Sequence, residues 1–106
     1  MNYIGDSVIG DNCSLGAGTV LANFPFDESN ISVRIGDELI DTGRSKLGAI
    51  IGNNSRTGVN VSVMPGVRIG PDSIVGPHVC LTGDLEPESF ILAEAVNKII
   101  RNRFRR

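Results

Sequence analysis

Few residues in this 106-residue chain have a type and spacing suited to catalysis, and the only histidine, His78, is the first of them. Histidine changes charge near neutral pH and can serve as a general base. No carboxylate stands at a spacing that would orient His78, so we interpret it as a surface side chain that points outward. A single histidine also argues against a zinc site, which usually takes three or four ligands. We therefore expect no metal.

Two further candidates lie near the N-terminus. Gly16-Ala17-Gly18 is similar to the opening of a dinucleotide-binding fingerprint, but the third glycine and the following helix are missing. We interpret it as a glycine-rich corner whose backbone N–H groups could line a cleft. Asn23 carries an amide that can both donate and accept hydrogen bonds toward a ligand. A plain corner asparagine with positive φ is an equal alternative for Asn23.

The elements that must position these residues follow a period of six. Neither a helix nor an ordinary strand repeats every six residues. A chain that turns a corner at every sixth residue does, and this pattern predicts a hexapeptide β-helix with its aliphatic side chains stacked along one axis. The first inward column comprises Ile9, Leu15, Leu21, Ile51, Thr57, Val63, Ile69, Val75 and Leu81, and the second comprises Cys13, Thr19, Pro25, Ser55, Val61, Val67, Ser73, Val79 and Leu85.

Interruptions of the count divide one predicted all-β domain, residues 1–106, into four parts. Residues 3–26 form a first coil, and residues 27–50 form an insertion. There the alternation on both sides of Gly36-Asp37 predicts a β-hairpin in which Val33 faces Ile40. Residues 51–86 give six uninterrupted hexads, or two further coils. Residues 87–106 give a capping strand and a short helix, because apolar side chains near its end recur at helical spacing.

Composition and charge limit the class of protein. The chain is 41% hydrophobic with no tryptophan, which suits a thin solenoid filled by small aliphatic side chains. A few coils need protected ends, so we expect self-association. The net charge is −2, but basic residues are concentrated in the last nine positions, 98–106. We interpret this basic tail as a solvated helix end rather than a nucleic-acid arm. No segment has the length of a membrane span or the pattern of a signal peptide, and the sequence favours a reduced cytoplasmic protein.

The stretch from Tyr3 to Asn23 resembles a known family. Its motifs Tyr3-Ile4-Gly5-Asp6, Leu15-Gly16-Ala17-Gly18-Thr19 and Ala22-Asn23 look like the C-terminal domain of bifunctional sugar-1-phosphate nucleotidylyltransferase/acetyltransferases. These are the glucosamine-1-phosphate N-acetyltransferases/UDP-N-acetylglucosamine pyrophosphorylases. The hairpin and Arg56-Thr57-Gly58-Val59-Asn60-Val61 look most like the archaeal branch. The resemblance covers about residues 3–92.

The resemblance implies a left-handed prism, a homotrimer and active sites between subunits. It also implies N-acetylation of an amino-sugar-1-phosphate by acetyl-CoA. Tyr3 matches a residue that contacts the sugar phosphate, and Asn23 matches one that holds the acceptor sugar. Ala17 matches a residue whose backbone N–H binds the acetyl thioester, an oxyanion-hole role. Phe24 stands where bacterial members have a tyrosine, and Ser14 where they have an asparagine.

Three departures from the family pattern concern the chemistry. The family's catalytic histidine would fall just before Met1, so no catalytic residue is assigned within the chain. Asp27-Glu28-Ser29 occupies the region of a phosphate-clamping lysine, and the next basic residue is Arg34. The arginine that meets the coenzyme A phosphate would fall at Glu94. We therefore expect Met1 to mark a truncation and the chain as given to transfer acetyl poorly.

Two functions follow from this pattern. The first is an acetyl-CoA-dependent acetyltransferase domain of a nucleotide-sugar enzyme. The second is a non-catalytic β-helix that trimerises its parent protein. The lost base favours the second for this chain, and the Gly16–Asn23 segment favours the first for its ancestry.

Overall fold

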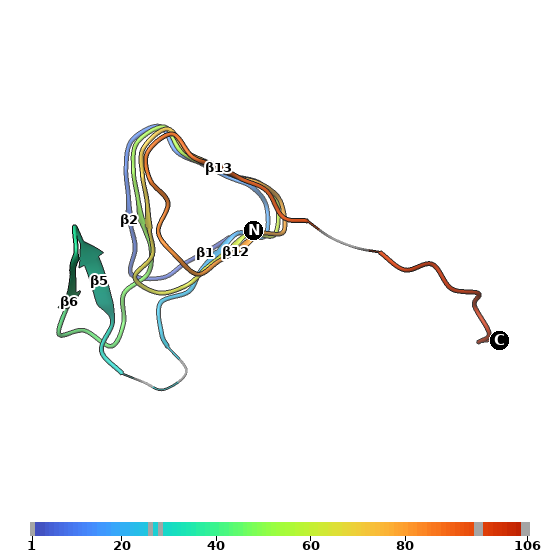
Figure 1. Cartoon of the computed structure of the whole chain (residues 1–106), viewed down its shortest axis with the longest axis horizontal. Helices are drawn as coiled ribbons and strands as arrows, with labels where there is room; N and C mark the ends of the chain where they lie inside the picture. Colours follow the sequence, from blue (N-terminus) through green and yellow to red (C-terminus); the bar gives the residue numbers. More distant parts are fainter. Residues whose placement is uncertain (1, 26, 28, 95–96, 105–106) are drawn as a thin grey trace.

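A three-sided β-helix with a hairpin beside it forms the body of the protein (Figure 1). The computed structural model describes residues 2–25, 27, 29–94 and 97–104. Its strands are two residues long except for the four-residue strands of the hairpin. They are β1 Tyr3–Ile4, β2 Val8–Ile9, β3 Ser14–Leu15, β4 Val20–Leu21, β5 Ser32–Ile35, β6 Glu38–Asp41, β7 Ile50–Ile51, β8 Arg56–Thr57, β9 Ser62–Val63, β10 Arg68–Ile69, β11 Ile74–Val75, β12 Cys80–Leu81 and β13 Phe90–Ile91.

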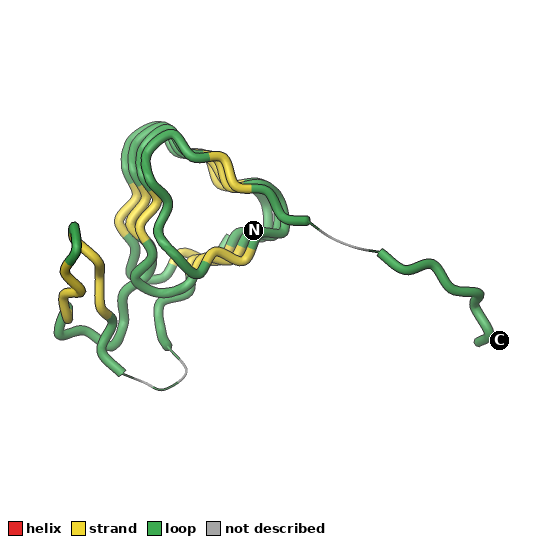
Figure 2. The backbone as a smooth tube through the Cα atoms, in the orientation of Figure 1, coloured by secondary structure: helices red, strands yellow, loops and turns green. Residues whose placement is uncertain are grey.

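Each of the first three turns of the helix contributes one strand to each of three parallel sheets, and the last turn adds a strand to two of them. Face A has the order β1-β4-β9-β12, face B the order β2-β7-β10, and face C the order β3-β8-β11-β13. Figure 2 shows the short strands stacked on the three sides with corners between them. The predicted winding about a three-cornered axis is therefore confirmed.

The core lies where the period of six places it. The inward positions from Ile51 to Leu81 are all buried, and the second column from Ser55 to Val79 is buried as well. The buried hydroxyls have partners, as polar groups in a core require. Ser55 Oγ donates to the Gly70 carbonyl at 3.1 Å, and Ser73 Oγ donates to the Glu86 carbonyl at 3.2 Å.

The insertion keeps the register of the coils. Leu15 pairs with Thr57, 42 positions later, whereas Thr57 pairs with Val75, 18 positions later. The difference of 24 residues equals four hexads, so the coil resumes in phase after the insertion. Within it, β5 and β6 pair antiparallel with Val33 opposite Ile40, as predicted.

The structure places the coil boundaries on the strands. Strand β4 stacks on β1 through the pair Tyr3 and Val20, so the stretch predicted as a first coil completes one turn before Val20 and then begins the first face of the next. At the other end the sixth hexad is shorter than the uninterrupted pattern predicted. Leu85 bridges to Ile69, 16 positions earlier, instead of taking the second inward position of a full hexad.

The predicted C-terminal helix is wrong for the described residues. The described residues 93–94 and 97–103 form no helix, and the described part of the tail runs away from the prism as an extended segment (Figure 2). Ile99 is 96% exposed and Phe104 is 89% exposed, so the apolar face of such a helix would have nothing to pack against. A helix this short is marginal in water without that packing. Val96, which was part of the helical pattern, lies outside the described residues.

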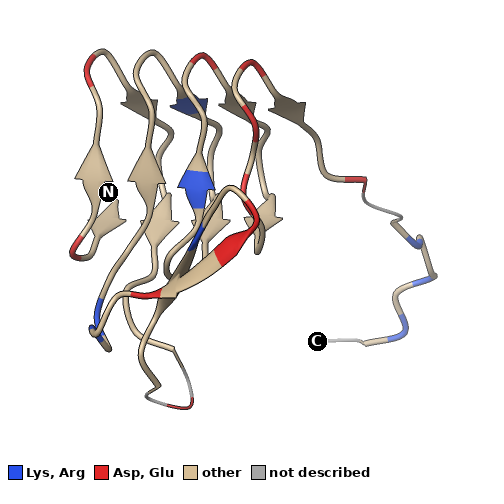
Figure 3. Cartoon of the chain, turned by 60° about the vertical axis from the view of Figure 1, so that its left-hand side comes forward, with Lys and Arg blue, Asp and Glu red and all other residues tan. Residues whose placement is uncertain are grey.

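Charged residues lie mainly at the corners, on the hairpin and along the tail (Figure 3). The tail carries Lys98, Arg101 and Arg103, and acidic residues recur at the corners of successive coils. The described residues contain no helix that could cross a membrane.

Candidate functional site

Tyr3 and Asn23 meet at one end of the prism. Because β1 and β4 pair in parallel, the corners after Ile4 and Leu21 lie one above the other. The Tyr3 hydroxyl donates to Asn23 Oδ1 at 3.4 Å. A Cβ on Gly5 would lie 2.5 Å from Asn23 Cγ, so only glycine lets the amide rest over this corner. The structure therefore brings together two of the three site residues that the sequence proposed.

Asp6 also belongs to this group, and sequence reasoning did not single it out. Asn23 Nδ2 donates to Asp6 Oδ2 at 2.9 Å. The Asp6 carbonyl accepts from Gly48 N at 2.9 Å, which fixes the backbone of this corner. The sequence feature that could have identified Asp6 is the Gly5-Asp6 pair. The same pair recurs as Gly10-Asp11 on the next face, so spacing alone could not show which aspartate lies beside Asn23.

Lys46, which follows the hairpin in the sequence, lies beside Phe24, the residue after Asn23. Leu47 N donates to the Asn23 carbonyl at 2.9 Å, so the chain returning from the insertion runs beside Asn23. This places Lys46 Nζ 5.7 Å from the centroid of the Phe24 ring, a cation–π arrangement. Sequence reasoning searched for a lysine soon after Asn23 and missed Lys46, which stands 23 positions later.

The segment directly after Phe24 is acidic where a phosphate clamp was sought. Hydrogen bonds from the Ser29 hydroxyl and backbone N–H hold the pKa of Asp27 below its usual value, because they favour the carboxylate. Asp27 therefore stays negatively charged at neutral pH and does not attract a phosphate. Lys46, which stands over Phe24, is therefore our candidate for a cation near Asn23.

Ala17 lies at the corner between face C and face A, before β4 begins, while Asn23 follows the other end of β4. The Gly16 carbonyl accepts from Thr19 N at 3.2 Å, and Gly18 has φ of +78°. These features define a type II turn with Ala17 at its second position. Ala17 N–H has no acceptor among the described residues, whereas its carbonyl accepts from Asn60 N at 2.9 Å. No hydrogen bond joins Ala17 to Tyr3 or Asn23 within the described chain.

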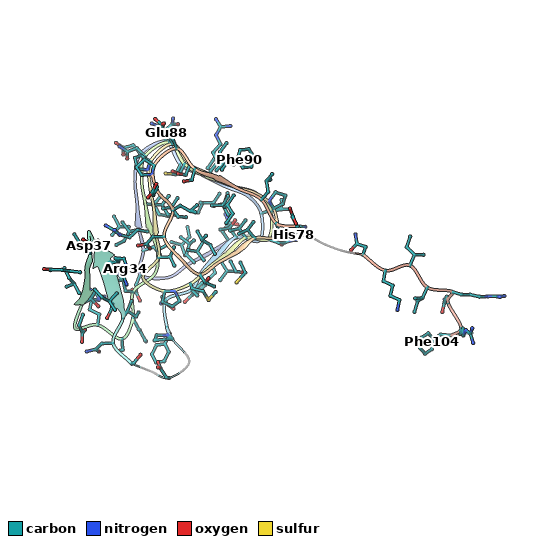
Figure 4. All side chains as sticks on the ribbon, viewed as in Figure 1. Arg34, Asp37, His78, Glu88, Phe90 and Phe104 are labelled. Atoms are coloured by element: carbon teal, nitrogen blue, oxygen red, sulfur yellow. The ribbon has the colours of Figure 1, made fainter. Side chains whose placement is uncertain are left out.

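His78 is an exposed corner residue, as the sequence predicted. It has φ of +63°, and its backbone N–H donates to the Val59 carbonyl at 2.9 Å. In Figure 4 its side chain lies at the corner of the prism from which the tail departs. The strand that follows it, β12, is three strands away from β1 in face A, or about 14 Å. Within one chain, His78 cannot act on a ligand held by Tyr3 and Asn23.

A cavity of about 560 Å³ lies apart from this group, between the hairpin and face B. Arg34 and Gly36 line it from the hairpin, and Ile50, Arg68 and Pro71 line it from the prism. Arg68 Nε lies 3.5 Å from Asp84 Oδ2, so one of the two arginines is already paired with a carboxylate. No three metal-ligating side chains gather anywhere in the part of the chain that the structure describes.

Comparisons with known proteins agree with this architecture. Residues 48–83 match the family described as bacterial transferase hexapeptide (six repeats). The bifunctional protein GlmU of Methanococcus aeolicus is 46% identical over 91 residues, which cover 86% of this chain and 22% of that protein. The bifunctional sugar-1-phosphate nucleotidylyltransferase/acetyltransferase of Sulfurisphaera tokodaii is 44% identical over 85 residues, covering 80% of this chain and 21% of that protein. The chain thus spans only about a fifth of the length of these curated relatives.

One solved structure matches the fold. Serine acetyltransferase isoform 3 from Entamoeba histolytica, in complex with cysteine, superposes with a TM-score of 0.66 at 17% identity. The match covers 92% of this chain and 29% of that chain. At this identity the likeness concerns the fold alone, a left-handed β-helix of hexapeptide repeats. The handedness that the family resemblance implied is confirmed.

Proposed function

The chain is a left-handed hexapeptide-repeat β-helix, 40–46% identical to archaeal bifunctional nucleotidylyltransferase/acetyltransferases, and on that premise we propose that it is the acetyltransferase part of such an enzyme. The reaction would be transfer of acetyl from acetyl-CoA to the amine of an amino-sugar-1-phosphate. The observation that carries the proposal is the contact between Tyr3 and Asn23, two residues far apart in sequence that the family resemblance assigns to the acceptor sugar.

The roles of the site residues follow from their chemistry. The acceptor's amine attacks the thioester carbonyl, and the Ala17 N–H, which faces no acceptor of its own in the described chain, stabilises the oxyanion that forms. The coenzyme A thiolate then leaves and takes up, directly or through water, the proton that the nitrogen loses, because no catalytic base is assigned within the chain. Asn23 and Tyr3 orient the sugar. Because Ala17 stands at a different corner, the thioester and the sugar would meet at an interface in which a second copy supplies one of the two corners.

A homotrimer is part of this proposal. Several apolar side chains on the outer faces are open to solvent in the single chain, among them Val8 at 61%, Phe90 at 63% and Leu92 at 66%. Val8 belongs to face B and Phe90 to face C, so apolar side chains on more than one face would be buried if copies of the chain packed around the prism. The same observation favours the second function, in which the β-helix assembles its parent protein without catalysis. A cytoplasmic location also stays a prediction.

Binding of acetyl-CoA separates the two functions. Isothermal titration calorimetry with acetyl-CoA should give a dissociation constant in the micromolar range if the chain is a transferase domain. A chain that binds no acetyl-CoA at millimolar concentration, while sedimenting as a trimer, would leave the assembly function alone.

Lys46 provides a test of the acceptor site. We expect Lys46→Met to weaken binding of glucosamine 1-phosphate about tenfold, because a hydrogen bond to a charged group contributes roughly 1.5–3 kcal/mol. Methionine keeps an unbranched stem over Phe24 and removes the ammonium group with its charge and hydrogen-bond donors. Calorimetry at two salt concentrations should show a smaller salt dependence for the variant.

Lys98→Met, in the exposed tail, is the matched control for the change in net charge. Equal affinities of Lys46→Met and Lys98→Met for the sugar phosphate would contradict a role for Lys46.

A further inference from the structure

We propose that Asp6 is a positioning residue that fixes the amide of Asn23, so that its carbonyl oxygen faces Tyr3 and accepts a hydrogen bond from the ligand. This inference rests on the proposed function, and it narrows the class of ligand to one that presents an N–H or O–H donor at this point. Asp6 itself would not touch the acceptor amine.

The orientation follows from what a carboxylate can do. An ionised aspartate accepts hydrogen bonds and donates none, whereas an amide has a donating and an accepting end. With 2.9 Å between Asn23 Nδ2 and Asp6 Oδ2, the amide nitrogen must face Asp6. Rotating the amide by half a turn would place its oxygen against the carboxylate, two acceptors in contact. Asp6 therefore selects one of the two orientations that Asn23 could adopt.

The other end of the amide is the part left for a ligand. Asn23 Oδ1 accepts from the Tyr3 hydroxyl at 3.4 Å, which is long for a hydrogen bond between oxygens. A ligand donor could displace this weak contact or share the oxygen, which has two lone pairs. Tyr3 is 53% exposed, so the oxygen lies beside an open surface. An amine or a hydroxyl meets a partner here, whereas a ligand carbonyl would meet another acceptor.

Asp6 is held rigidly enough for this role. It has φ of +35°, and its carbonyl accepts from Gly48 N at 2.9 Å. On its other side, Ser7 Oγ donates to the Gly5 carbonyl at 2.7 Å and accepts from Ala49 N at 3.0 Å. Asp6 and Ser7 are thus both hydrogen-bonded to the next coil, and Ser7 in turn holds Gly5.

Two substitutions test Asp6 without breaking the corner. Asp6→Gly removes the carboxylate and tolerates positive φ. Asp6→Asn retains a side chain that tolerates positive φ but can pair with Asn23 in either orientation. Asp11→Gly and Asp11→Asn are the matched controls, because Asp11 follows Gly10 as Asp6 follows Gly5, and its carboxylate has no partner among the described residues.

Two measurements apply to each variant. Calorimetry with glucosamine 1-phosphate gives the affinity. We expect Asp6→Gly to weaken it about tenfold, Asp6→Asn to weaken it less, and the Asp11 variants to leave it unchanged. NMR of the Asn23 side-chain amide reports the contact without any ligand. Its Nδ2 protons should exchange with water more slowly in the wild type than in Asp6→Gly.

The outcomes separate this inference from the proposed function. If the wild type binds no sugar phosphate but the Asn23 protons lose protection in Asp6→Gly, the proposed function fails and the positioning contact stands. If those protons exchange equally fast in the wild type and in Asp6→Gly, the inference is overturned. It is also overturned if protection is lost in Asp6→Gly while the affinity stays at the wild-type value.

Discussion

Leu21→Ala should destabilise the protein by about 3 kcal/mol, because it removes the largest side chain that is fully buried among the described residues and leaves a cavity. Leu21 lies inside face A, between Ile4 of the first turn and Val63 of the third. Neighbouring coils are held apart by their own backbone hydrogen bonds, so the space cannot close. The measurement is urea unfolding at one protein concentration, since an oligomer's stability depends on concentration.

Ile99→Ala is the control for Leu21→Ala. Ile99 is 96% exposed, and its truncation should change the free energy of unfolding by less than about 0.5 kcal/mol. Equal midpoints for the two variants would contradict the inward ladder at Leu21. A loss at Ile99 as large as that at Leu21 would instead mean that the tail is buried in the assembly.

The core residues could be predicted from the sequence because the period of six within each coil decides which side chains point inward. A corner every sixth residue brings Ile51, Val63 and Leu81 inward whatever the rest of the chain does, so counting was sufficient. The hairpin was also local, since alternation around Gly36-Asp37 fixes its register. The short sixth hexad was missed because a leucine four residues after Leu81 fits two patterns. Leu85 could be the second inward residue of a full hexad or, as the structure has it, the first inward residue after a shortened one.

The failures concern contacts that sequence distance does not encode. The helical pattern after Ala93 was real, but a helix of that length needs a surface to pack on, and the described tail touches none. Lys46 lies over Phe24 because the insertion begins and ends at the same corner of the prism, which places these two residues side by side. Asp6 and Asn23 meet because 17 residues make one turn between their corners. Only the closed prism shows which corners coincide.

Ala17→Pro should lower the rate of acetyl transfer about 100-fold, because proline has no N–H to hold the oxyanion, and loss of one such donor typically costs 10²–10³ in kcat. The fold should tolerate the change. Ala17 occupies the second position of a type II turn, where proline is favoured. The chain uses that residue itself in the equivalent turn at Pro65-Gly66, where Gly66 also has φ of +78° and Val67 N donates to the Met64 carbonyl at 3.3 Å.

The assay follows release of the coenzyme A thiol with glucosamine 1-phosphate as acceptor, alongside the unfolding midpoint. Ala17→Ser is the control, because it changes the side chain and keeps the backbone N–H. We expect Ala17→Pro to unfold at the wild-type midpoint or slightly above it, since proline restricts the unfolded chain. A proline variant that folds normally and transfers acetyl as fast as Ala17→Ser would remove Ala17 from the oxyanion role. A proline variant with a lowered midpoint would contradict the assignment of the turn. Proline fits this position in the turn at Pro65-Gly66, so a loss of stability would mean that the backbone at Ala17 differs from the backbone at Pro65.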